Sequence, residues 1–117
     1  MAISSYRDLI AWQEAMALAE TVYLLTEKLP KAEQFDLTSQ TRRAAVSVPA
    51  NIAEGWGRDG RGMYVQHLRI AQGSLKELET YVLLSVRLRM FSQDDAAATL
   101  AKCEHVGKIL RGLIRSL

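Results

Sequence analysis

The sequence has a single cysteine, Cys103, two prolines and only 7% aromatic residues. One cysteine cannot form an internal disulfide, so nothing indicates a disulfide-stabilised fold or an oxidising compartment. No apolar run reaches the roughly 18 residues that a membrane-spanning helix needs. The first residues, MAISSYRDLIAW, also lack the basic and apolar regions of a secretory signal. These absences lead us to expect a cytoplasmic protein without a membrane segment.

Histidine is scarce as well, with only His67 and His105 in the chain. A di-iron helical bundle needs Glu-x-x-His motifs, but Tyr64 and Lys102 stand three residues before the two histidines. No Cys/His cluster has the spacing of a zinc site, and no hydroxyl–imidazole–carboxylate set is suggested. The sequence therefore predicts no metal, no cofactor and no enzymatic activity.

Apolar residues recur at helical spacing along almost the whole chain, and strand-like alternation is absent. The Leu29-Pro30 pair ends a first helix, and Ser92, followed by two aspartates, is a suitable N-cap for the last one. The expected helices cover residues 6–28, a segment beginning near 36 or 38, residues 62 or 63 to 89, and the residues after 92. Joined by short links, they predict an all-α fold, an antiparallel up-down four-helix bundle, as a single domain over residues 1–117.

Each expected helix has a stripe of apolar or small residues that should face the core. In the first helix the stripe comprises Leu9, Trp12, Met16, Ala19, Val22 and Thr26. In the second it comprises Leu37, Thr41, Ala44, Val48, Ile52 and Gly55. The third has a heptad seam of Tyr64, Leu68, Ala71, Leu75, Leu78, Val82 and Ser85. The last has Leu100, Cys103, Val106, Leu110, Leu113 and Leu117.

The first and last helices carry more apolar residues than one stripe can bury. Tyr23, Leu24 and Leu25 are consecutive, and the last helix contains IL at 109–110 and LI at 113–114. Consecutive helical residues point about 100° apart, so some of these side chains face away from the core. We therefore expect a second contact surface and self-association into a homo-oligomer.

The stretch SVPANIAEGWGRDGR, residues 47–61, combines a proline with clustered glycines. Gly55, Gly57 and Gly60 match the G-x-G-x-x-G dinucleotide-binding pattern, but a helix precedes them and no βαβ unit is present. A structural interpretation accounts for the stretch better. Pro49 should kink the second helix, and the first two glycines should allow close packing and a left-handed cap.

Arg61 and His67 form an R-x5-H pattern that is reminiscent of the HEPN family of helical ribonucleases. In such a site the histidine could act as acid or base while the arginine holds the phosphate. The arginine is followed here by a glycine, where that family usually has a polar side chain. RNA cleavage is therefore the enzymatic alternative, set against an ordinary histidine near the start of a helix.

Polar side chains run beside the apolar stripes of the second and third helices. The set comprises Ser47, Asn51, Glu54, Ser74 and Glu77. A carboxylate partly buried between helices must be hydrogen-bonded or paired. We expect these residues to form a structural polar network that fixes the register of the helices.

Positive charge is concentrated in the middle of a chain whose net charge is only +2. Residues 42–89 hold eight basic and four acidic residues, and seven of the eight are arginines. Guanidinium groups match the geometry of phosphates. The candidate nucleic-acid contacts are Arg42, Arg43, Arg58, Arg61 and Arg69. Trp56 and Tyr64 are the only aromatic residues near this basic turn, so sequence-specific readout by stacking is not expected.

Three segments carry a family resemblance: YRDLIAWQEAMAL at 6–18, FDLTSQTRRAAVSVPANIAEGWGR at 35–58 and RIAQGSLKELETYVLL at 69–84. They resemble the four-helix-bundle family encoded in intervening sequences of bacterial 23S ribosomal RNA genes. That family is similar to the accessory protein of diversity-generating retroelements, a barrel-like homopentamer that binds nucleic acid and its reverse transcriptase through basic surface. The resemblance implies a homopentamer with a basic face, and it supplies no established activity.

Charge and resemblance together predict a non-enzymatic, oligomeric helical bundle that binds RNA or DNA weakly through an Arg-rich surface. The alternative is a protein-interaction scaffold that docks a partner protein without contacting nucleic acid. In that case the arginines serve only salt bridges and solubility.

Overall fold

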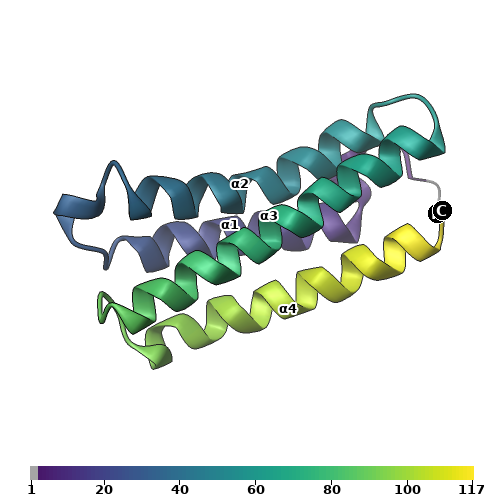
Figure 1. Cartoon of the computed structure of the whole chain (residues 1–117). Coiled ribbons are helices and arrows are strands. Elements are labelled where there is room, and N and C mark those ends of the chain that lie inside the picture. The colour runs from purple at the N-terminus through teal and green to yellow at the C-terminus, as the bar shows by residue number, and fades with distance from the viewer. Residues whose placement is uncertain (1–2) are drawn as a thin grey trace.

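Four α-helices pack side by side, and consecutive helices run in opposite directions (Figure 1). The computed structural model describes residues 3–117. The helices are α1 (Ile10–Thr26), α2 (Leu37–Trp56), α3 (Arg61–Arg87) and α4 (Gln93–Arg115). Two short 3-10 helices, η1 (Tyr6–Asp8) and η2 (Lys31–Glu33), precede α1 and α2. The expected all-α four-helix bundle is confirmed over the described residues.

Each helix packs against two neighbours, in the order α1, α2, α3, α4 and back to α1. One core therefore runs along the axis of an elongated molecule of 44 × 24 × 19 Å. Its largest fully buried side chains come from all four helices and include Leu18, Ile52, Leu68, Leu75, Leu78 and Leu110. Burial of each leucine contributes about 1.5–3 kcal/mol, so this core supplies the main favourable term in folding. No helix within residues 3–117 is long and apolar enough to cross a membrane.

Helix α1 begins later than the sequence predicts. Leu9 has an extended backbone (φ −73°, ψ 126°) that separates η1 from α1. Ser5 and Asp8 form a capping box at η1: the Ser5 hydroxyl accepts from the Arg7 N–H, and the Asp8 carboxylate accepts from the Ser5 N–H. This cap satisfies backbone donors before the true start of α1, and the chain can then turn at Leu9.

The buried face of α1 also differs from the predicted stripe. The core-facing residues are Ala11, Ala15, Leu18, Ala19, Val22, Leu25 and Thr26. Met16, predicted to be buried, is 38% exposed, and Trp12 is only half-buried. The prediction gave weight to large side chains, whereas Ala11 and Ala15 face the core because small side chains let neighbouring helices approach closely.

The core faces of α2 and α3 are those that the sequence predicts. All six residues of the predicted α2 stripe are buried. The α3 seam is buried from Leu68 to Ser85, and Tyr64 is half-buried at its start. In α4 the predicted stripe is buried in its middle, while Leu100, Leu113 and Leu117 are partly buried against the core.

Helix α2 runs without interruption through Pro49. Six residues later, Gly55 allows the close packing with α3 that the sequence predicts. A Cβ at Gly55 would lie 2.7 Å from the Cβ of His67 and 3.1 Å from Cδ1 of Tyr64. Only glycine brings these two helices so close without displacing α3.

The left-handed cap predicted at Gly57 is wrong. Gly57 keeps a right-handed backbone (φ −78°, ψ −8°), and its N–H donates to the Ala53 carbonyl 3.2 Å away. The left-handed conformation occurs at Gly60 (φ 90°), the N-cap residue of α3. The helical hydrogen bonds of α2 therefore extend to Gly57, and Gly60 makes the turn into α3.

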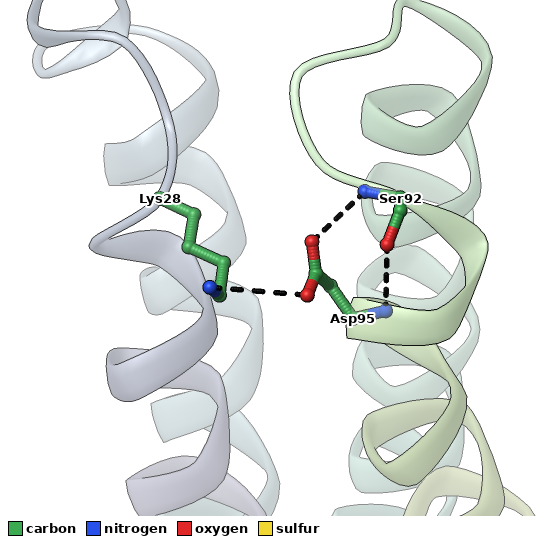
Figure 2. Close-up of polar contacts among 3 residues, drawn as sticks. All are labelled: Lys28, Ser92 and Asp95. Carbon is green, nitrogen blue, oxygen red and sulfur yellow. Dashed lines mark hydrogen bonds and ion pairs between the residues drawn. The ribbon is translucent and has the colours of Figure 1, made fainter.

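Ser92 caps α4 as the sequence predicts. Its hydroxyl accepts from the Asp95 N–H at 3.0 Å, and Asp95 Oδ2 accepts from the Ser92 N–H at 3.1 Å (Figure 2). Lys28, which follows α1, places its Nζ 3.8 Å from Asp95 Oδ1. The hydrogen bonds from Ser92 and the nearby ammonium hold the pKa of Asp95 below its usual value. The start of α4 is thus tied to the end of α1.

Candidate nucleic-acid interface

The five candidate arginines do not form one surface patch. Arg42 and Arg43 lie near the start of α2, whereas Arg58 and Arg61 lie after its end. Fifteen residues separate Arg43 from Arg58, which corresponds to about 22 Å along a helix axis. The fifth, Arg69, lies in the first half of α3. The candidate arginines therefore lie toward two opposite ends of the bundle. The contacts of each arginine indicate its role.

Arg42 joins α2 to the last turn of α1. Its Nε donates to the Thr26 hydroxyl at 2.8 Å, and a terminal nitrogen donates to the Tyr23 carbonyl at 3.3 Å. The guanidinium carbon also lies 4.6 Å from the centre of the Tyr23 ring. A cation at a helix C-terminus is favourable, so Arg42 has a structural role that already engages its charge.

Arg58 and Arg61 are also engaged within the chain. A terminal nitrogen of Arg58 lies 2.9 Å from Glu54 Oε1, one helical turn away, and this hydrogen bond lowers the pKa of Glu54. Arg61 Nε donates to the main-chain oxygen of Leu117, which connects the start of α3 to the residues after α4. Each arginine therefore already uses part of its hydrogen-bonding capacity inside the chain.

Arg43 and Arg69 are exposed and make no side-chain hydrogen bond or ion pair with the described residues. Arg43 lines a groove of about 550 Å³ between α2 and α3, together with Glu77 and Tyr81. The Tyr81 hydroxyl donates to Glu77 Oε2 at 3.3 Å, so an acidic group sits in that groove. Of the five predicted contacts, Arg69 is therefore the one that is exposed, has no side-chain partner among the described residues and shares no groove with a carboxylate.

The structure brings together three of the five residues predicted to form a polar network. The Ser47 and Ser74 hydroxyls lie 2.8 Å apart across the α2–α3 interface. The Asn51 side chain donates to the Ser47 carbonyl at 2.8 Å and to its hydroxyl at 3.0 Å. His67 Nδ1 lies 3.2 Å from Asn51 Oδ1, so the histidine is protonated on Nδ1 when it donates to this oxygen. A line of hydrogen bonds thus connects the two helices.

Glu54 and Glu77 are not part of this network. Both are exposed; Glu54 pairs with Arg58 and Glu77 accepts from Tyr81. Their helical spacing predicted them beside the polar stripe, but both carboxylates are exposed to water. His67 joins the network instead, although its sequence pattern suggested only a ribonuclease residue or an ordinary histidine near the start of a helix.

Trp56 and Tyr64 pack against each other instead of presenting flat faces to solvent. Their ring centres are 6.2 Å apart and nearly perpendicular, and both residues are half-buried. The Tyr64 hydroxyl is buried and has no hydrogen-bond partner among the described residues, and burial raises the pKa of Tyr64. These rings belong to the α2–α3 packing, so they are poorly placed to stack on bases.

No group of three His, Cys, Asp or Glu side chains within residues 3–117 is arranged to hold a metal ion. Cys103 is buried, and desolvation raises the pKa of its thiol to about 12. The second histidine, His105, is exposed on α4, with Nε2 3.7 Å from Glu14 Oε1. Because its pKa is raised, the Cys103 thiol is held in its neutral form, which is a poor nucleophile and a poor metal ligand.

Two comparisons with known proteins identify relatives. Residues 7–112 match the family model described as 23S rRNA-intervening sequence protein. A crystal structure of a protein of unknown function from the S23 ribosomal protein family of Bacteroides thetaiotaomicron superposes with a TM-score of 0.83. It is 21% identical in sequence and covers 90% of this chain and 98% of its own, so it supports the fold alone. A search of curated proteins gave no match.

Proposed function

The chain belongs to the 23S rRNA-intervening sequence protein family, and we propose that it is a non-enzymatic, self-associating helical bundle that binds the phosphate backbone of nucleic acid. The proposed setting is the bacterial cytoplasm. Three features of the molecule support this function: exposed arginines that lack partners, a histidine engaged in helix packing, and an apolar surface on α1 and α2.

The exposed arginines are the observation that carries the proposal. Six of them form no ion pair, no side-chain hydrogen bond and no aromatic contact within the described residues: Arg43, Arg69, Arg87, Arg89, Arg111 and Arg115. A guanidinium group is weakly hydrated and can bind phosphate through two parallel hydrogen bonds. Six such groups on a chain of net charge +2 favour a role in binding a polyanionic partner over a role in solubility alone.

The contacts of Arg61 and His67 support a binding protein over a ribonuclease. His67 is half-buried and its Nδ1 faces Asn51, while Arg61 bonds to the main chain of Leu117. A general acid or base has to reach the substrate proton, directly or through one water. We expect no cleavage of a labelled structured RNA by the wild-type protein. Cleavage that is lost in His67→Ala would establish the enzymatic alternative.

An apolar groove supports self-association. Met16, Tyr23 and Leu24 of α1 and Val46 of α2 line a groove of about 460 Å³, and Leu24 is 68% exposed. Phe35, in the link between these helices, is 90% exposed. A partner that covers these side chains removes apolar surface from water, at about 25 cal/mol per Å². The homopentamer that the family resemblance implies is the assembly we propose.

Light scattering on a size-exclusion column tests the assembly. We expect the mass of an oligomer for the wild type and a smaller mass for Leu24→Asp, because a carboxylate buried in an apolar interface is costly. The exposed Lys102→Asp on α4, away from this groove, is the matched control. A wild-type protein that elutes as a monomer at all concentrations would contradict self-association.

Fluorescence anisotropy with labelled structured RNA and duplex DNA tests nucleic-acid binding. We expect an affinity that falls steeply as salt rises, because each neutralised phosphate releases counterions. Flat traces at low salt would contradict the proposal. A specific protein recovered from a nuclease-treated lysate, together with flat traces, would favour the scaffold function instead.

A further inference from the structure

A shallow groove follows the contact between α3 and α4, which lie side by side in Figure 1. The groove measures about 320 Å³ and is lined by Gln72, Gly73, Leu75, Lys76, Gly107 and Arg111. Two of its lining residues are glycines, so parts of its floor are bare helix backbone. None of the lining side chains is acidic or aromatic.

Basic side chains extend this groove in both directions. Arg69 precedes Lys76 by seven residues, which is two helical turns, so both lie on one face of α3. On α4, Lys108 and Arg115 stand three residues before and four residues after Arg111, on the same face as the lining residue. We call Arg69, Lys76, Lys108, Arg111 and Arg115, together with the lining residues, the basic groove.

The basic groove carries more positive charge than the whole chain. Two carboxylates form ion pairs with its lysines: Glu79 lies 3.0 Å from Lys76, and Glu104 lies 3.5 Å from Lys108. Five basic and two acidic side chains give a net charge of +3, whereas the chain carries +2. The other residues of the chain therefore sum to −1.

The three arginines of the basic groove have no ion pair within the described residues. A terminal nitrogen of Arg111 lies 3.6 Å from the place where a Cβ on Gly107 would be, so this guanidinium lies over the glycine of the groove. A Cβ at Gly73 would meet nothing within 4 Å, so the opposite wall is open to an approaching ligand.

From this arrangement we infer that the basic groove between α3 and α4 binds one phosphodiester strand of a nucleic-acid duplex. The inference rests on the proposed function and assigns it a surface. Arg111 and Arg115 are four residues apart, about 6 Å along α4, so they can contact successive phosphates. Proteins that hold single strands combine basic grooves with aromatic stacking platforms. This groove has none, and backbone contact to a duplex without base readout is what its chemistry supports.

Charge-neutralised variants test the surface against a matched control. The groove variant is R69Q/R111Q/R115Q, and the control is K28Q/K31Q/K102Q, which removes the same charge from exposed lysines outside the basic groove. Binding of labelled duplex RNA, duplex DNA and a single-stranded oligonucleotide is measured by anisotropy across salt, with circular dichroism as the check on folding. All six positions are exposed, so both variants should fold.

We expect the groove variant to lose at least about tenfold in duplex affinity at low salt, and its slope of log K against log salt to fall by about 2 to 3. The control should stay within about threefold of the wild type. Equal loss in both variants, or no loss in the groove variant, would overturn the assignment of the surface while leaving the proposed function intact. If the wild type binds the single strand as tightly as the duplex or more tightly, the assignment of a duplex as the ligand is wrong. Comparing its affinities for duplex RNA and duplex DNA shows which of the two nucleic acids the groove binds.

A second pair of variants leaves every arginine in place. Gly73→Glu adds a carboxylate to the open wall of the groove, and Gly62→Glu adds one in the first turn of α3 at a position that also has nothing within 4 Å of its Cβ. The residues three and four after Gly62 are Val65 and Gln66, so this carboxylate has no residue of the basic groove as a helical neighbour. Repulsion predicts that only Gly73→Glu weakens duplex binding, by about fivefold or more. Equal effects of the two substitutions would overturn the inference, and absence of wild-type binding would overturn both it and the proposed function.

Discussion

Replacing Gly55 by alanine tests whether the α2–α3 contact depends on a missing side chain. The added Cβ would lie 2.7 Å from His67 Cβ, 3.1 Å from Tyr64 Cδ1 and 3.3 Å from the Tyr64 carbonyl oxygen. Two of these three atoms are a Cβ and a main-chain oxygen, which cannot move without shifting α3. Gly73→Ala is the matched control, because a Cβ at this mid-helix glycine meets nothing within 4 Å.

The two substitutions should change stability in opposite directions. Alanine stabilises a helix interior over glycine by about 0.5–1 kcal/mol, and Gly73→Ala should show this gain. At Gly55 the same gain is outweighed by overpacking, which costs about 1–3 kcal/mol in a close-packed interface. We expect Gly55→Ala to lose about 1–2 kcal/mol, or about 4–8 °C in Tm for a domain of this size.

Urea unfolding followed by circular dichroism measures both variants, at one fixed protein concentration because the chain is proposed to self-associate. The two unfolding free energies should differ by about 2 kcal/mol or more. A Gly55→Ala protein as stable as Gly73→Ala would show that α2 and α3 are not in this close contact at Gly55.

Two further substitutions and one alkylation reaction test other parts of the structure. Asn51→Ala should destabilise the protein by about 1–3 kcal/mol in urea unfolding, because it leaves the polar groups of Ser47 and His67 without their partner; a change within about 0.5 kcal/mol would contradict this. Because the pKa of Asp95 is lowered in the folded state, its stabilising effect is present above its unfolded pKa and is lost as pH falls through the folded value. The wild type should therefore be more stable than Asp95→Asn at neutral pH, and this difference should shrink in acid. Cys103, with a pKa near 12, should resist iodoacetamide at pH 8 in the folded protein and react once unfolded; rapid alkylation without denaturant would contradict its burial.

Sequence periodicity was sufficient to predict the bundle because each helix buries a stripe with a period close to four residues. It succeeded best in α2 and α3, where the stripe residues from Leu37 to Ile52 and from Leu68 to Ser85 are buried. In α1 it was right for the buried residues Leu9, Ala19, Val22 and Thr26. It was wrong for Met16, because apolar residues occur on several faces of α1 and the choice between Met16 and Ala15 depends on how closely α2 and α4 approach. A pattern within one helix contains no information on that distance.

The site was less predictable, because charge was counted along the chain and not across helices. Arg42 and Arg58 look equivalent in sequence, yet one bonds to Thr26 and the other to Glu54. Arg111 and Arg115 are not among the predicted contacts because their segment is nearly neutral, although Arg111 lines a groove with Lys76 of α3. The sequence of either helix alone does not contain the pairing of α3 with α4 that forms this groove.

If arginines of this bundle contact the phosphates of a nucleic-acid duplex, binding must weaken steeply with salt. The salt dependence of wild-type affinity for a short labelled duplex is measured by anisotropy from low to physiological salt. We expect a straight line of log K against log salt with a slope of about −3 or steeper, one phosphate for each arginine of the basic groove. A slope near zero, or no binding at low salt, would contradict it.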